Sequence, residues 1–214
     1  MNRWKGALVP TESVERERII KAAYRCLDET GGGGASVSDI LRTAGLSTRA
    51  FYRHFDSKDD LLLAMFRRDS ERMLTELQGA AASAATPVDA LRGWIETMLR
   101  VPSDKRRRRH VQILSSEGAQ RAVGYAAERS RSMVAQEAAL AQILHRGLRD
   151  GSFPWAEPEA DARFIRAVIG QAFEDQMAPT ASASAVEAAD RVLDFTLRAL
   201  GAKTPVQAEG PPSR

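Results

Sequence analysis

One stretch of the sequence decides the fold, and it reads Ile40-Leu41-Arg42-Thr43-Ala44-Gly45-Leu46-Ser47-Thr48-Arg49-Ala50-Phe51-Tyr52-Arg53-His54-Phe55. Apolar residues at helical spacing stand on both sides of Gly45, so two short helices joined by a tight turn are predicted. Gly45 permits the positive φ that such a turn often needs, and Ser47 is a typical N-cap of the second helix. The stretch therefore predicts a helix-turn-helix, whose core is closed by Ile40, Ala44, Leu46, Phe51 and Phe55.

The second of these helices leaves polar and cationic side chains on its outer face. In a helix-turn-helix, the residues near the N-terminus of this helix contact base edges in the major groove of DNA. Arg can donate two hydrogen bonds to guanine, while a Thr side chain or an Ala methyl can contact thymine. The predicted base contacts are Thr48, Arg49, Ala50 and Arg53. Hydrogen-bond donors around them are placed to hold phosphates, helped by helix N-termini: Ser36, Ser38, Ser47, Tyr52, His54 and Lys58.

The charge of this segment favours the same interpretation. Between residues 42 and 58 the cations Arg42, Arg49, Arg53 and Lys58 stand against a single anion, Asp56. A local excess of this kind is expected of a phosphate-binding surface. The net charge of the whole chain is only +3 over 214 residues, which permits nucleic-acid binding without requiring it.

Helical periodicity continues along the rest of the chain, and no segment shows the sustained alternation typical of strands. Capping-box patterns at Ser36 and Ser184 predict where two helices begin. The first helix is predicted over 12–30, where Gly31 to Gly34 end it. Further helices are predicted from Lys58 over about five turns, and over 88–100, 103–116, 119–150, 158–177 and 185–201. The predicted fold class is all-α.

From Leu46 to Leu61 the sequence resembles the signature of TetR-type transcriptional regulators. In that signature a Tyr-x-His-Phe-x-x-Lys core follows the turn, and here it is found at residues 52–58. The similarity extends over about residues 15–66, and beyond them it is limited to length, helix count and Gly147-x-x-x-Gly151 with Phe153. The sequence departs from the family at Leu41, where a small Ala is common, and in its flexible four-glycine linker.

The resemblance implies a homodimer with an N-terminal three-helix helix-turn-helix domain and a C-terminal helical ligand-binding and dimerisation domain. The domains are accordingly predicted at 12–57 and 58–201, with flexible tails at 1–11 and 202–214. The positions that match the family's base-facing residues are Thr48, Arg49, Ala50 and Arg53, and those that match its phosphate-facing residues are Tyr52, His54 and Lys58.

Two apolar sets outside the helix-turn-helix each have two interpretations. The first could line a ligand cavity or belong to ordinary core, and consists of Met65, Phe66, Trp94, Met98 and His110. The second follows the last two helices and suits a four-helix interface between two subunits, as the resemblance also implies; otherwise it is core. It consists of Phe164, Val168, Ile169, Phe173, Val192, Leu193, Leu197 and Leu200.

The most conspicuous charge run is Lys105-Arg106-Arg107-Arg108-Arg109, followed by His110. Five consecutive cations point all around a helix, so they cannot form one groove-reading face. They are either the solvated start of a helix or, if the segment touches the DNA-binding domain as the resemblance implies, a further source of phosphate attraction.

The function predicted from these features is that of a sequence-specific DNA-binding transcriptional regulator. It is expected to be a homodimeric repressor that binds a pseudo-palindromic operator in double-stranded DNA and is released by a small-molecule effector. The alternative is a helical small-molecule-binding or redox-responsive protein whose DNA contact is incidental. For Cys26 a buried position is favoured over a redox role.

Other function classes find no support in the sequence. It contains no recognisable carboxylate pair, nucleophile motif or Gly-rich phosphate loop, so no enzyme is predicted. The three histidines stand far apart without metal-ligand spacing, so neither a metal nor another cofactor is expected. No run of about 18 apolar residues and no signal-peptide pattern is found, so a cytoplasmic protein without a membrane partner is predicted.

Overall fold

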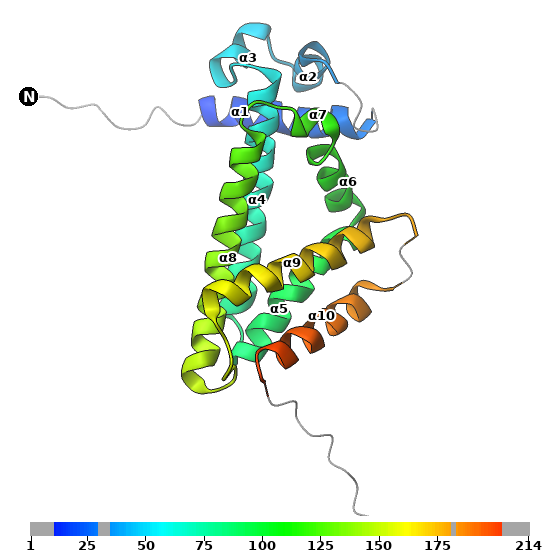
Figure 1. Cartoon of the computed structure of the whole chain (residues 1–214). Coiled ribbons are helices and arrows are strands. Elements are labelled where there is room, and N and C mark those ends of the chain that lie inside the picture. Colours follow the sequence, from blue (N-terminus) through cyan, green and yellow to red (C-terminus); the bar gives the residue numbers. More distant parts are fainter. Residues whose placement is uncertain (1–10, 30–34, 181–182, 203–214) are drawn as a thin grey trace, which may run out of the picture. The chain divides into compact units, whose positions relative to one another are not determined.

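The computed structural model describes residues 11–29, 35–180 and 183–202. Within these ranges the chain is helical and contains no strand, which confirms the predicted all-α class (Figure 1). None of the described helices is both long and apolar enough to span a bilayer. The glycine linker and nearly all of both predicted tails lie outside the described residues.

The described residues form two compact units. Unit 1 combines the chain up to Ser70 with Arg109–Ser130, and unit 2 combines Glu71–Arg108 with the chain from Arg131 onward. This division differs from the predicted boundary at residue 57, because Leu61, Met65 and Ile113 are buried in the same apolar core as the first three helices.

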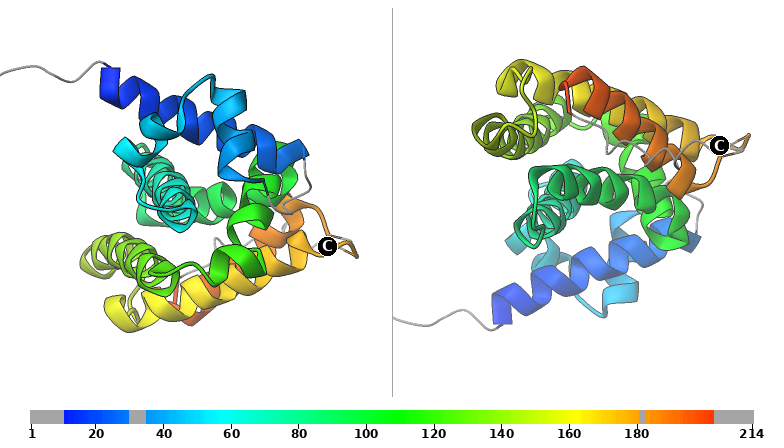
Figure 2. Two further views of the ribbon diagram at one scale, coloured as in Figure 1. Left: turned by 90° about the horizontal axis from the view of Figure 1, so that it is seen from above. Right: turned by 90° about the horizontal axis from the view of Figure 1, so that it is seen from below.

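Unit 1 is built around α1 (Thr11–Glu29), α2 (Val37–Ala44) and α3 (Thr48–His54). It also takes in the first turns of α4 (Lys58–Ala82), the end of α6 (Lys105–Leu114), all of α7 (Glu117–Gln120) and the first residues of α8 (Tyr125–Asp150). In Figure 2, α1 runs beside both α2 and α3. Their shared core includes Ile19, Ile20, Ile40, Phe51 and Phe55.

Unit 2 contains α5 (Pro87–Arg100), the short 3-10 helix η1 (Val101–Ser103), α9 (Pro158–Met177) and α10 (Ala185–Ala199). The helices α5, α9 and α10 pack against one another. The apolar stripe of α5 is the centre of the core, because it meets side chains from α4, α8, α9 and α10. This stripe consists of Leu91, Trp94, Ile95 and Leu99.

The local signals for helix ends are confirmed in most places. Ser36 and Ser184 each form a complete capping box, and Gly45 closes α2 in the left-handed region at a φ of 62°. The single helix predicted over 119–150 is wrong. The chain turns at Gly124, whose φ of 93° cannot occur within an α-helix, and so separates α7 from α8.

Gly147 is required at its position in α8 by the ring of Phe153. The segment after α8 folds back so that the Phe153 amide donates to the carbonyl oxygen of Gly147 at 2.9 Å. A Cβ added at Gly147 would overlap the buried Phe153 ring, whereas one added at Gly79 in α4 would meet no atom within 4 Å.

We therefore expect Gly147→Ala to destabilise the protein by about 1–3 kcal/mol, the usual range for overpacking. Gly79→Ala is the matched control and should be neutral or stabilising by up to about 1 kcal/mol, because Ala favours helix over Gly. Urea unfolding followed by circular dichroism measures both. Equal free energies of unfolding for the two variants would contradict this account of Gly147.

Candidate nucleic-acid interface

The start and end of α2 are fixed by local hydrogen bonds. The Ser36 hydroxyl accepts the Asp39 amide at 3.1 Å and donates to the Asp39 carboxylate at 2.6 Å. That hydroxyl bond, together with one from the Ser36 amide, lowers the pKa of Asp39 below its ordinary 3.8. At the other end, Leu46 donates its amide to the carbonyl oxygen of Leu41 at 3.0 Å across Gly45. Backbone hydrogen bonds thereby close the turn between α2 and α3.

Three side chains of α1 donate hydrogen bonds to the end of α2, next to the same turn. Arg18 Nη2 donates to the carbonyl oxygen of Ala44 at 2.7 Å, and Arg25 Nη2 reaches that of Thr43 at 3.4 Å. These cations lie at the C-terminal end of α2, where the helix dipole favours positive charge. The Cys26 thiol, which is buried as predicted, donates to Thr43 Oγ1 at 3.2 Å.

The outer face of α3 carries most of the predicted base-contacting side chains. Thr48, Arg49 and Arg53 are exposed together with Tyr52, 60% of whose surface is accessible. The helix begins at Ser47, whose hydroxyl accepts the Ala50 amide at 3.3 Å. A short polar surface is therefore presented by the first two turns of a capped helix.

Ala50 does not belong to this face, and its predicted contact with a base is corrected here. Its side chain is only 4% exposed, and it is buried on the same side of α3 as Phe51. Because successive helical residues are separated by about 100°, Ala50 faces away from Thr48 and Tyr52. The methyl group therefore packs inside unit 1 and does not face solvent.

A carboxylate from α1 engages the C-terminal end of α3. Glu15 Oε2 lies 2.8 Å from Arg53 Nη1 and 3.1 Å from His54 Nε2. Since a carboxylate only accepts hydrogen bonds, His54 Nε2 carries a proton here. The pKa of Glu15 is lowered below its ordinary 4.5, first by the hydrogen bond from His54 and then by the charges of Arg53 and Arg18.

This contact changes the expectation for His54 and adds a residue that the helix-turn-helix motif does not contain. The His54 side chain is 6% exposed, so in this conformation it offers little surface to a phosphate. Glu15 is 38 residues before Arg53 in the sequence. The only available signal was its position one turn before Ile19, at the edge of the buried face of α1.

The other predicted phosphate-contacting residues lie at the N-terminal ends of helices. Ser36 and Ser38 are exposed at the start of α2, as is Ser47 before α3, and Lys58 is half-buried in the first turn of α4. The Ser36 and Ser47 hydroxyls already cap their own helices. The donors that remain at these helix starts are the exposed Ser38 hydroxyl, the Lys58 ammonium and the first backbone amides.

The cations of the basic run at the start of α6 differ in their contacts, so the run is neither wholly solvated nor wholly free to attract phosphate. Arg107 pairs with Glu76 at 2.8 Å, and Arg109 pairs with Asp28 at 3.0 Å. Arg108 donates to the last carbonyl oxygens of α9, at 3.0 Å to Gln176 and 2.6 Å to Met177. Lys105 and Arg106 are the two exposed members.

The predicted cavity residues are divided between the two units. Met65, Phe66 and His110 belong to unit 1, where His110 stacks on Tyr24 with ring centroids 3.9 Å apart. Trp94 and Met98 belong to the core of unit 2.

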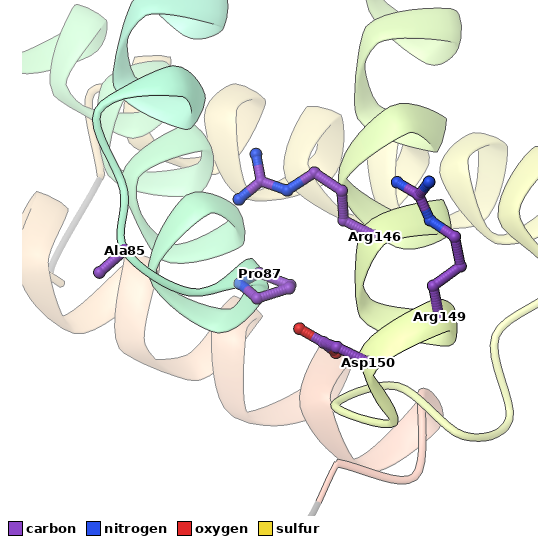
Figure 3. A pocket seen from close by; sticks show the side chains of 5 residues that line it. All are labelled: Ala85, Pro87, Arg146, Arg149 and Asp150. Atoms are coloured by element: carbon purple, nitrogen blue, oxygen red, sulfur yellow. The ribbon is translucent and has the colours of Figure 1, made fainter.

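An open hollow of about 430 Å³ in unit 2 is lined by other side chains (Figure 3). Arg146, Arg149 and Asp150 give it a charged wall, and Ala85 and Pro87 complete it. Because charged side chains line it, this hollow is not an apolar ligand site.

The predicted interface set is also divided, and half of it is corrected. Ile169, Val192, Leu193 and Leu200 are buried in the core of unit 2, so they are not surface residues of this chain. The partly buried members are Val168, Phe173 and Leu197, which pack at the edge of that core. Phe164 remains 68% exposed.

Carboxylates lie beside all three histidines. His54 contacts Glu15, His110 Nδ1 lies 3.3 Å from Asp69, and His145 Nε2 lies 2.8 Å from Glu159. Within the described ranges, no group of three or more His, Cys, Asp or Glu residues is arranged to hold a metal ion.

Comparison with known proteins agrees with the geometry of unit 1. Residues 19–65 match the family described as "Bacterial regulatory proteins, tetR family". These residues are therefore similar to the helix-turn-helix segment of that family. A 61-residue segment is 41% identical to the "HTH-type transcriptional repressor AcnR" of Corynebacterium diphtheriae, over 28% of this chain and 32% of that protein. The chain spans less than half the length of the curated relatives it matches first.

Solved structures resemble the chain over most of its length. SmeT in complex with triclosan has a TM-score of 0.73 at 24% identity, covering 94% of this chain and 100% of the other. FadR from Bacillus subtilis in complex with stearoyl-CoA has a TM-score of 0.70 at 18% identity, covering 86% and 98%. At these identities the likeness establishes the tetR-type fold and not a shared ligand.

The capping box of α2 provides a test of how the interface is held. Ser36→Ala removes the hydroxyl that accepts the Asp39 amide, and we expect a loss of about 1 kcal/mol in the free energy of unfolding. Ser38→Ala, two residues further along, removes an exposed hydroxyl within the helix and should be neutral or slightly stabilising. Urea unfolding at pH 7 measures both.

The same variant has a predicted pH dependence. Because the pKa of folded Asp39 lies below its ordinary 3.8, the carboxylate's share of the capping energy is complete above that pH. It is lost as the pH falls through the folded pKa. The difference between wild type and Ser36→Ala should therefore shrink below pH 3.8, and a difference that grows there would contradict the assignment.

Proposed function

We propose that this chain is a sequence-specific DNA-binding transcriptional regulator. The observation that carries the proposal is the outer face of α3, where Thr48, Arg49 and Arg53 are exposed while the opposite face is buried. A capped helix of this kind, held at a fixed angle by α1 and α2, suits the major groove of DNA. In the proposed complex these three side chains contact base edges.

The phosphates on either side are held by groups that surround this face. Ser38, Tyr52 and Lys58 supply side-chain donors, and the N-termini of α2 and α3 supply backbone amides. From the basic run, the exposed Lys105 and Arg106 are the members left to attract phosphate. Binding is therefore expected to weaken as the salt concentration rises.

The regulator is proposed to act as a homodimer through α9 and α10. Phe164 on α9 and Phe195 on α10 are 68% and 51% exposed, and aromatic side chains are enriched in protein interfaces. Half-buried Val168, Phe173 and Leu197 lie on the same two helices. A two-fold dimer would present two copies of α3 to a pseudo-palindromic operator.

We further propose that the protein is a cytoplasmic repressor that a small-molecule effector releases from DNA. The support is the repressor named among its relatives and the two similar structures that were solved in complex with a small molecule. An effector that binds better to a conformation with the wrong spacing of the two α3 helices would weaken DNA binding by that difference in affinity. A redox response has no support from Cys26, whose thiol is buried.

The function is tested by selection from a library of random-sequence DNA duplexes. The wild-type protein should enrich a pseudo-palindrome, whereas Arg53→Ala should enrich a site in which one position of each half-site has lost its preference. A bidentate Arg contact discriminates between bases by about 1–3 kcal/mol. The matched control is Arg149→Ala, which removes a cation from the end of α8 in unit 2.

The control should enrich the same site as the wild type. If the wild-type protein enriches no sequence, the proposed function is wrong. If Arg53→Ala enriches an unchanged site, Arg53 does not read a base.

The dimer surface is tested by placing a charge on it. Phe164→Glu buries a carboxylate against apolar side chains of the second subunit, so we expect a shift from dimer to monomer in sedimentation equilibrium. Val134→Glu is the control, because Val134 on α8 is 60% exposed and lies outside the proposed surface. A monomeric wild type, or dimers of equal stability for both variants, would rule out this interface.

A further inference from the structure

The side chain of Arg53 is held by α1 while it faces solvent at the end of α3. Its Nη1 atom lies 2.8 Å from Glu15 Oε2, and 47% of the side chain is exposed. The same oxygen accepts a hydrogen bond from His54 Nε2 at 3.1 Å. Two donors from consecutive residues thus meet on one carboxylate oxygen, of a side chain that is only 19% exposed.

The contact leaves Arg53 able to bind a further acceptor. Guanidinium carries five N–H donors in a rigid fork, and the bond to Glu15 is made through one terminal nitrogen. The other nitrogens remain for a base edge. A long side chain that is already oriented loses less conformational entropy when it binds, so the contact pre-organises Arg53.

The charge of Glu15 has a second consequence. Arg53 is attracted both to base acceptors and to the phosphates of any DNA sequence, and the phosphate attraction carries no sequence information. A carboxylate beside the guanidinium reduces that general attraction. It therefore lowers affinity for random DNA more than affinity for the correct base.

We propose that Glu15 is a positioning residue that sets the base preference of Arg53. The proposal rests on the proposed function, because it requires Arg53 to read a base. His54 takes part by holding the carboxylate from its other side, which gives this buried ring a role other than phosphate contact.

The chain offers a matched control for Glu15 on the same helix. Glu17 is half-buried in α1, and its carboxylate pairs with Arg68 of α4 at 2.7 and 2.9 Å and with Lys21 at 3.4 Å. Glu17→Gln removes the same charge two residues away and disturbs partners on α1 and α4. Glu15→Gln removes the charge that faces α3.

The experiment is selection from a random-sequence duplex library with wild type, Glu15→Gln and Glu17→Gln. We expect Glu15→Gln to reduce the preference at the position read by Arg53 about five- to tenfold in each half-site, toward the low end of a bidentate contact. Glu17→Gln should retain the wild-type preference. Affinity for random DNA should rise in both variants, because both lose one negative charge.

A second measurement separates positioning from a general effect on the fold. In the Arg53→Ala background, Glu15→Gln should cause no further change in the selected site, because the side chain through which it acts is gone. Circular dichroism melting monitors the fold of each variant. If Glu15→Gln unfolds, Glu15→Asp is used in its place. It keeps the charge but has a shorter side chain, and we expect the same loss of base preference at the position read by Arg53.

The outcomes distinguish this proposal from the proposed function. If the wild type enriches a site and Glu15→Gln behaves like Glu17→Gln, the role of Glu15 is wrong and the function stands. If Glu15→Gln causes a further change of the selected site in the Arg53→Ala background, the role of Glu15 is also wrong. If the wild type enriches no site, both proposals are wrong.

Discussion

Burial of one face of α1 against α2 and α3 is the interaction on which the N-terminal unit depends. The helices α2 and α3 have eight and seven residues, lengths at which isolated helices are not stable in water. Ile19, Ile20 and Ala23 of α1 are buried with Ile40 and Phe51 in one core. Apolar burial thus supplies the stabilising free energy that the hydrogen bonds of two short helices cannot supply alone.

The polar edges of α1 give this packing its orientation. Arg18 donates to the last carbonyl of α2, while Glu15, one turn earlier, accepts from the end of α3. Hydrogen bonds are directional, whereas apolar burial is not, so these contacts fix which way the two helices face. The exposed side of α3 is consequently a property of three helices and not of α3 alone.

The parts of the fold that could be predicted depend on neighbours in sequence. The caps at Ser36 and Ser47 and the positive φ of Gly45 follow from the chemistry of single residues within a few positions. The outward placement of Arg49 and Arg53 follows from helical periodicity. Glu15 could not be found in this way, because its partners lie 38 and 39 residues away. The same holds for Arg108, which binds the end of α9.

Periodicity also fails where both sides of a helix are apolar, as α9 and α10 illustrate. Their stripes suited either a subunit interface or ordinary core, yet the structure divides them, because Ile169 and Val192 lie in the core while Phe164 faces outward, as does Phe195. A helix of the core and a helix of an interface bury the same residue types, and only the position of α5 decides which face is which. Exposed aromatics opposite a filled core are therefore better evidence for a second subunit than the apolar stripe itself, because nothing within unit 2 accounts for them.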